Sequence, residues 1–246
     1  KMATKLEHFL YKKSWKIATA TNGIKEYMIE HGKNEKDVFM LPNGVNTNLF
    51  KPLPKDTSLI KELGLEGKFV FTYAGTMGHA QGLDSILKSA ELLLDDNPNV
   101  HFLFVGEGQE KENLIRIAKE ANLSNVTFMD GVPINKMPSI FSISDYSVVS
   151  LRDIELFNGA RPSKIFSALS TGTPVIYCGK GESAEIINEN ECGVVVPPED
   201  SKALANAISE LVKISYNEYQ NLSKKSRELA VEKFSWPSIV DELLEN

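Results

Sequence analysis

The sequence predicts an α/β fold, a doubly wound parallel sheet of about six strands with helices on both faces. From Lys68 onward, short apolar runs rich in Val, Ile, Phe and Tyr alternate with helical patterns. These runs lack the alternation of apolar and polar residues found in a strand with one wet face, which indicates burial on both faces. Strand and helix in such alternation specify a doubly wound sheet, whose ligands bind beyond the carboxyl ends of the strands.

The strands and helices of this sheet can be placed from the same pattern. Two segments between the strands would place their apolar residues on one face of a helix, which predicts amphipathic helices at Leu83 to Leu94 and at Leu114 to Ala121. The six strands are expected at Phe69 to Tyr73, His101 to Val105, Val126 to Met129, Tyr146 to Val149, Val175 to Tyr177 and Val194 to Val196.

The first fifty residues follow a different pattern. A basic amphipathic stretch leads into a strand at Ile17 to Ala20, a helix at Asn22 to His31 and a strand at Val38 to Leu41. One strand–helix–strand unit is too small to close a core of its own, so we expect it to be the end of another domain. Because the sequence begins with Lys1 rather than Met, we expect a fragment of a longer protein.

Four parts of the chain are expected. Pro52 and Pro54 interrupt a segment without apolar periodicity, which predicts a linker. Ser235 is the expected cap of a last helix that begins at Trp236. The parts are a domain remnant at 1–47, the linker at 48–55, the α/β domain at 56–233 and the last helix within 234–246.

Composition excludes several classes of protein. The chain has 246 residues, a net charge of −6 and 42% hydrophobic residues, which is typical of globular domains. Its apolar runs are far shorter than the roughly 18 residues that span a bilayer, and no signal core stands at the N-terminus. The acidic balance disfavours nucleic-acid binding. We expect a cytoplasmic protein in which Cys178 and Cys192 are reduced, buried thiols.

The loop after the first strand of the sheet, residues 74–83, is rich in glycine. Gly75 and Gly78 let the backbone approach a ligand, and a helix that begins near Gln81 directs free N–H groups at an anion. A phosphate is the natural ligand, and a plain turn is the alternative. His79 either contacts a phosphate or sugar hydroxyl or is simply solvated.

The loops after the second and third strands carry weaker signals. Gly106 permits close approach and Glu107 offers a carboxylate to hydroxyl groups, but a turn that closes the unit explains both equally well. Val132, Pro133 and Ile134 form an apolar shelf that suits a flat heterocycle, an interpretation we rank below a plain loop.

Two cations stand at a predicted helix start after the fourth strand. Arg161 and Lys164 are three residues apart, with Pro162 in the first turn. Beside free helix N–H groups they form a clamp for a diphosphate, and solvated surface charges are the alternative. After the fifth strand, Glu182 is a candidate contact for a sugar and Ser183 for a phosphate, with helix capping as the alternative.

Five such loops at one edge of a sheet together indicate an anionic, nucleotide-like ligand. The sequence lacks the glycine-rich patterns of P-loop NTPases and of dinucleotide oxidoreductases. It also lacks the nucleophile elbow of serine hydrolases and any His, Cys and Asp cluster with metal-ligand spacing, so no metal is expected.

In this order, the loops resemble the retaining glycosyltransferases of family four, whose GT-B fold has two Rossmann-like domains across a cleft. Within the family they are similar to the branch that transfers N-acetylated amino sugars, such as L-fucosamine, in O-antigen and capsule synthesis. The resemblance rests on Pro42 to Phe50, Tyr73 to Gly82, Val105 to Gly108, Arg161 to Phe166, Thr171 to Ile176 and Gly181 to Ala184.

The resemblance implies that residues 1–47 end an acceptor domain that is otherwise missing, and that the last helix crosses back onto it. The donor domain would bind a UDP-sugar as substrate, without cofactor or metal, for transfer to a glycan or lipid-linked glycan. Arg161 and Lys164 would be the catalytic residues, which balance the diphosphate charge. The implied donor-binding residues are Gly75, Gly78, His79, Gln81, Gly106, Glu107, Val132, Pro133, Ser163, Ser167, Glu182 and Ser183.

Two departures from the family pattern bear on activity. Thr76 and Gln81 replace an Arg and a Lys, which fits the amino-sugar branch. Gly159 and Ser167 replace a pair of glutamates, the second of which grips the ribose in the family. Loss of a charged hydrogen bond of this kind is worth roughly 1.5–3 kcal/mol.

Two other functions stay open beside transfer. One is a nucleotide-sugar binding module or inactive paralogue that needs a partner acceptor domain; the other, less favoured, is a UDP-sugar 2-epimerase. The basic first helix, with Lys5, Lys12 and Lys13, is either a solvated face, which we favour, or a peripheral contact with the inner face of an anionic membrane.

Overall fold

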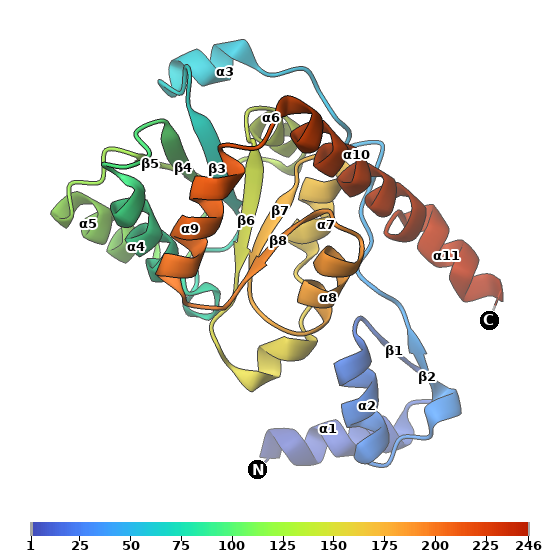
Figure 1. The fold of residues 1–246 in the computed structure, drawn as a ribbon. Coiled ribbons are helices and arrows are strands. Elements are labelled where there is room, and N and C mark those ends of the chain that lie inside the picture. Colours follow the sequence, from blue (N-terminus) through green and yellow to red (C-terminus); the bar gives the residue numbers. More distant parts are fainter. Residues whose placement is uncertain (1, 246) are drawn as a thin grey trace.

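The computed structural model describes residues 2–245 and contains a six-stranded, all-parallel sheet beside a smaller N-terminal unit (Figure 1). The strand order is β5-β4-β3-β6-β7-β8. All six strands predicted from the sequence are confirmed, with ends that differ by one residue at most. They are β3 (Phe69–Ala74), β4 (Val100–Val105), β5 (Val126–Met129), β6 (Tyr146–Ser150), β7 (Val175–Cys178) and β8 (Gly193–Val196).

Helices cover both faces of the sheet, as the uninterrupted apolar strands require. One core joins a face of the sheet to α4 (Asp84–Leu93), α5 (Lys111–Glu120) and α9 (Ser201–Leu211). The other core lies under α6 (Met137–Ser142), α7 (Ser163–Ser170), α8 (Glu182–Glu189) and α10 (Tyr216–Lys233). Chain order reverses between β3 and β6, because β4 and β5 lie on one side and β7 and β8 on the other. In doubly wound sheets this switch point is where ligands bind.

The N-terminal unit is the predicted strand–helix–strand motif preceded by a helix. It consists of α1 (Met2–Lys13), β1 (Ile17–Thr19), α2 (Asn22–Glu30) and β2 (Val38–Met40), with β1 and β2 paired in parallel. A short helix, α3 (Thr57–Glu62), leads into the larger domain. The division of the chain into domains stays a prediction.

The last helix, α11 (Trp236–Glu245), begins where expected and lies beside the N-terminal unit (Figure 1). The Ser235 hydroxyl accepts a hydrogen bond from the Ser238 N–H at 3.2 Å, which confirms the predicted cap. The indole of Trp236 lies so close to Gly44 that a Cβ there would be 2.6 Å from the ring. Gly44 is therefore needed for the chain to pass this helix start.

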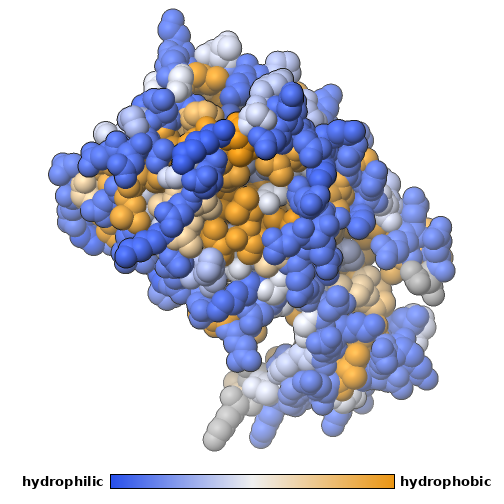
Figure 2. Space-filling view, in the orientation of Figure 1, coloured by the Kyte–Doolittle hydropathy of each residue, from blue (hydrophilic) through white to orange (hydrophobic). Residues whose placement is uncertain are grey.

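Polar side chains dominate the face of the molecule seen in Figure 2, with an apolar area near the middle of the sheet domain. The exposed apolar side chains of the N-terminal unit include Leu6, Phe9 and Trp15. Within residues 2–245, no helix combines the length and the apolar character that crossing a membrane requires.

Candidate functional site

A cavity of about 590 Å³ opens at the switch point, beyond the carboxyl ends of β3 and β6. Its volume falls in the range typical of small-molecule sites. It brings together parts of the loops after β3, β5 and β6 with the segment that enters the larger domain. The lining residues are Phe50, Ala74, Gly75, Thr76, Ala80, Gln81, Ile134, Met137, Phe141, Leu151, Phe157, Ala160, Arg161, Pro162, Ser163, Lys164 and Ser167.

Lys164 is the central charge of this cavity. It lies in the first turn of α7, and its ammonium donates a hydrogen bond to the Tyr73 hydroxyl at 2.8 Å. Burial lowers the pKa of Lys164 from 10.5 to about 8. The ammonium has no carboxylate partner within residues 2–245, and none of the cavity-lining residues is acidic. The uncompensated positive charge of Lys164 therefore favours the binding of an anion in this cavity.

Arg161 lines the same cavity but already has a partner. Its Nε donates to Glu182 Oε2 at 2.8 Å, and the two side chains are only 13% and 14% exposed. The other carboxylate oxygen of Glu182 accepts the Gly23 N–H at 2.8 Å, at the start of α2. Two residues predicted to contact a ligand thus contact each other, and Glu182 lies outside the cavity lining.

The loop after β4 packs against the loop after β3 rather than lining the cavity. A Cβ on Gly106, whose φ is +148°, would lie 2.0 Å from the Gly75 carbonyl oxygen. Only glycine permits this approach. Glu107 accepts hydrogen bonds from the Gly131 N–H and the Lys111 ammonium, both at 3.0 Å, and these bonds lower its pKa.

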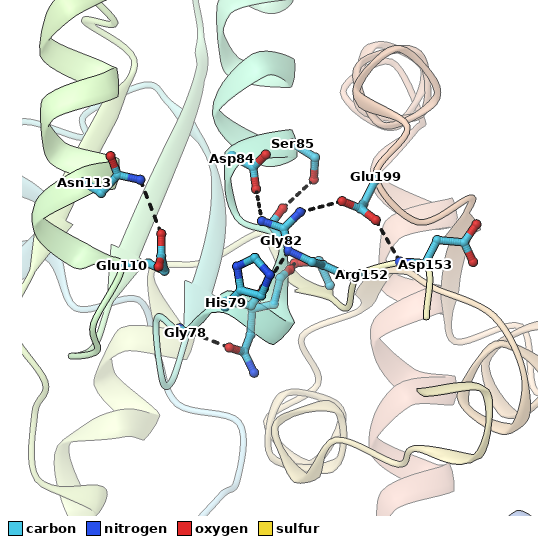
Figure 3. Close-up of polar contacts among 12 residues, drawn as sticks. Gly78, His79, Gly82, Asp84, Ser85, Glu110, Asn113, Arg152, Asp153 and Glu199 are labelled. Atoms are coloured by element: carbon cyan, nitrogen blue, oxygen red, sulfur yellow. Dashed lines mark hydrogen bonds and ion pairs between the residues drawn. The ribbon is translucent and has the colours of Figure 1, made fainter. Parts of the chain in front are cut away.

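The loop after β3 divides between two sites. Gln81 lines the cavity, and its side-chain oxygen accepts the Gly78 N–H at 3.0 Å. Gly78 and His79 line a neighbouring cleft of about 290 Å³ (Figure 3). There the His79 carbonyl accepts a hydrogen bond at 2.8 Å from Arg152, which also pairs with Asp84. The His79 side chain is exposed and lies outside the main cavity.

Three further predicted residues stand apart from the cavity. Val132 packs against the second core, and neither it nor Pro133 lines the cavity wall, where Ile134 and Met137 stand instead. Ser183 is buried, and its hydroxyl donates to the Ala160 carbonyl at 2.8 Å.

Two predicted serines do reach the cavity. Ser163 and Ser167 both line it, one turn apart on α7. The aromatic lining residues Phe50, Phe141 and Phe157 were missed, since an apolar residue of a site has the same sequence pattern as a core residue.

Residues 55–229 match the family described as glycosyl transferases group 1. The match covers more than half of the chain. The chain belongs to this family. Its larger domain is the Rossmann-like domain of a GT-B fold, as the sequence predicts.

Individual relatives are distant, and each is longer than this chain. The protein named "Probable glycosyltransferase WbjE" of Pseudomonas aeruginosa is 24% identical over 91% of this chain and 60% of its own length. Spore coat protein SA of Bacillus subtilis is 26% identical over 74% of this chain and 49% of its own length. The chain thus spans about half to three-fifths of these curated relatives.

Among solved structures, HepE of Anabaena in complex with UDP and glucose has the same fold. It superposes with a TM-score of 0.82 at 19% sequence identity, over 96% of this chain and 63% of HepE.

Proposed function

We propose that this chain is the donor-binding part of a retaining, metal-independent glycosyltransferase. The donor is a UDP-sugar, and the acceptor is a glycan or lipid-linked glycan of a bacterial polysaccharide such as O-antigen or capsule. Family membership supports the class of reaction. The observation that carries the proposal is Lys164, a largely buried ammonium that faces a cavity at the switch point and has no carboxylate partner among the described residues.

The chemistry proposed for this half of the enzyme is stabilisation of the departing diphosphate. Negative charge grows on the diphosphate as its bond to the sugar breaks, and a preorganised cation lowers the energy of that state more than that of the bound donor. Lys164 supplies this charge, and the first-turn N–H groups of α7 add hydrogen bonds. Arg161 contributes less charge because Glu182 offsets it.

The proposed sugar is an N-acetylated hexosamine or deoxyhexosamine. The basis is the loop after β3, where Thr76 and Gln81 line the cavity without charge, as in the amino-sugar branch that the sequence resembles. The UDP and glucose held by HepE support a UDP-linked donor in general.

A second candidate, a binding module or inactive paralogue, is favoured by one observation. Ser167 stands in the cavity where the family pattern has a glutamate, and its hydroxyl makes no hydrogen bond within residues 2–245. A hydroxyl holds a ribose more weakly than a carboxylate does.

Isothermal titration with UDP tests the donor site. Wild-type protein is expected to bind, and Lys164→Ala to lose about 10- to 100-fold in affinity, since a charged hydrogen bond is removed. Lys213→Ala is the matched control, because Lys213 is exposed and forms its ion pair with Glu210, three residues earlier in the chain. If wild-type protein gives no binding heat at millimolar UDP, the proposed donor site is wrong.

Release of UDP from UDP-N-acetylglucosamine separates transfer from mere binding. An active donor site is expected to hydrolyse the donor slowly even without an acceptor, and the Lys164→Ala variant is expected not to. Tight binding of UDP with no release by wild-type protein favours the binding module.

A further inference from the structure

Tyr73 occupies a rigid position directly beneath the cavity. It belongs to β3, one of the two central strands, where it pairs in register with Phe104. Its side chain is 1% exposed and packs in the first core, against the ring of Phe104. The hydroxyl nevertheless meets Lys164, which projects from a helix on the other face of the sheet.

Lys164 reaches this hydroxyl by crossing the edge of the sheet over Gly75. A Cβ at Gly75 would lie 3.1 Å from the Lys164 Nζ and 3.2 Å from its Cε. The ammonium also lies 4.4 Å from the centre of the Tyr73 ring. The side chain therefore passes through a gap that a glycine leaves open and stops at one defined partner.

The direction of the hydrogen bonds follows from their chemistry. An ammonium can only donate, so the Tyr73 oxygen accepts from Lys164. The Tyr73 proton is then directed to the Thr76 carbonyl, which can only accept. Burial raises the pKa of Tyr73, which keeps this phenol protonated. Two N–H groups of the ammonium have no partner within residues 2–245.

We propose that Tyr73 is a positioning residue, whose hydroxyl holds the Lys164 ammonium charged and aimed so that its two remaining N–H groups meet the diphosphate of the donor. This positioning role rests on the proposed function only in naming the donor diphosphate as the ligand. Among the described residues that line the cavity, Arg161 is the other charged one, and it is paired with Glu182. Arg227 of α10, which packs along α7, contacts the far end of that helix at Ser170.

Tyr73→Phe removes this one oxygen, and Tyr146→Phe is the matched control. Tyr146 is 2% exposed in the neighbouring strand β6, and its hydroxyl has no hydrogen-bond partner within residues 2–245. Both substitutions thus delete a buried phenol oxygen, and only the first deletes an acceptor for Lys164.

Lysine Cε signals followed by NMR from pH 6 to 10, without ligand, read the pKa of Lys164 directly, and Lys164→Arg identifies its signal. Because an ammonium that loses its acceptor stays desolvated, the pKa is expected to fall by about one unit in Tyr73→Phe and to stay unchanged in Tyr146→Phe. An unchanged pKa in Tyr73→Phe overturns the proposal whether or not UDP binds.

Titration with UDP at several pH values supplies the second measurement. Tyr73→Phe is expected to bind about tenfold more weakly at pH 7.5, and its affinity to decline from a lower pH than in wild-type protein. A merely structural defect would lower affinity equally at every pH, which contradicts positioning. Failure of wild-type protein to bind UDP refutes the proposed ligand and leaves the NMR result to decide the role of Tyr73.

Discussion

The ammonium of Lys164 loses much of its hydration when the chain folds, and no acidic group within residues 2–245 compensates for that loss. Its pKa falls from 10.5 to about 8, a difference that corresponds to about 3 kcal/mol against the charged form. A purely structural position of this kind would favour an apolar residue. The charge is therefore best understood as a stability cost retained for ligand binding.

Lys164→Met is accordingly expected to stabilise the protein by about 1–3 kcal/mol at pH 7 while it weakens binding of UDP by about 10- to 100-fold, as expected for Lys164→Ala. The direction of this effect follows from the pKa of Lys164, because the folded state binds the proton less well than the unfolded state. Below about pH 8 both states are protonated, so the charged lysine destabilises the folded state by the full amount. This destabilisation disappears as the pH rises from about 8 to 10.5. Urea unfolding of both proteins across this range measures the difference.

The control for that stabilisation is Lys180→Met, at an exposed lysine that pairs with Asp153. It is expected to change the free energy of unfolding by no more than about 0.5 kcal/mol. A Lys164→Met protein that is less stable than wild type at pH 7 would contradict the account of an uncompensated charge.

Glu182 tunes the second cation of the cavity. Its carboxylate offsets Arg161 and also holds the Gly23 N–H. Glu182→Gln keeps an oxygen for Gly23 but removes the negative charge, so the affinity for UDP is expected to rise about fivefold at low salt. Calorimetry in 20 and 300 mM salt measures the gain, which should shrink as salt screens it. Asp153→Asn is the control, and weaker binding by Glu182→Gln would show that Arg161 needs its partner.

At the scale of elements, the loops after β3 and β4 act as one unit. Gly106 lies against the Gly75 carbonyl, and Gly108 lies as closely against the Met77 carbonyl. The backbone N–H of Gly75 donates to the Val105 carbonyl at 2.9 Å, and that of Met77 to the Glu107 carbonyl at 2.8 Å. The second loop therefore fixes the first, which carries Gly75 under Lys164.

Gly106→Ala is expected to lower the free energy of unfolding by about 3 kcal/mol or more, because the methyl group meets backbone and φ is strongly positive. UDP binding should weaken as well, since Gly75 is displaced. Gly64→Ala is the control: its φ is also positive, but no atom lies within 4 Å of a Cβ there, so only about 1 kcal/mol is expected. Denaturant unfolding measures both, and equal losses would argue against loop packing as the cause.

The sheet was predictable because its signals are local. Each strand is a contiguous apolar run, and parallel pairing then fixes which loops share an edge. The cavity was predictable only in part. Lys164 and Gly75 were found from charge and glycine placement at that edge. The roles of Gly106 and Ser183 could not be predicted, because each residue contacts the backbone of a different loop, at Gly75 and at Ala160. The sequence pattern does not show which loops come into contact.

At the scale of the whole molecule, one side chain connects α10 to two other segments beside the cavity. Arg227 of α10 donates to the carbonyls of Thr47, Phe50 and Ser170, at 3.2, 2.8 and 2.6 Å. These carbonyls belong to the segment between the two units and to the end of α7. Because Phe50 lines the cavity and α7 carries Lys164, this arginine links the junction of the units to the site.

Arg227→Ala is therefore expected to destabilise the protein by about 2–3 kcal/mol, since three partly buried carbonyls lose a charged donor, and to weaken UDP binding several-fold through Phe50. Arg227→Lys should restore little, because one ammonium cannot reproduce the planar fork. Arg116→Ala, at an exposed arginine paired with Glu120, controls for loss of charge and should change stability by less than about 0.5 kcal/mol. Urea unfolding and calorimetry on the same samples decide the matter: unchanged UDP affinity in a destabilised Arg227→Ala protein would mean that the junction supports the fold without shaping the cavity.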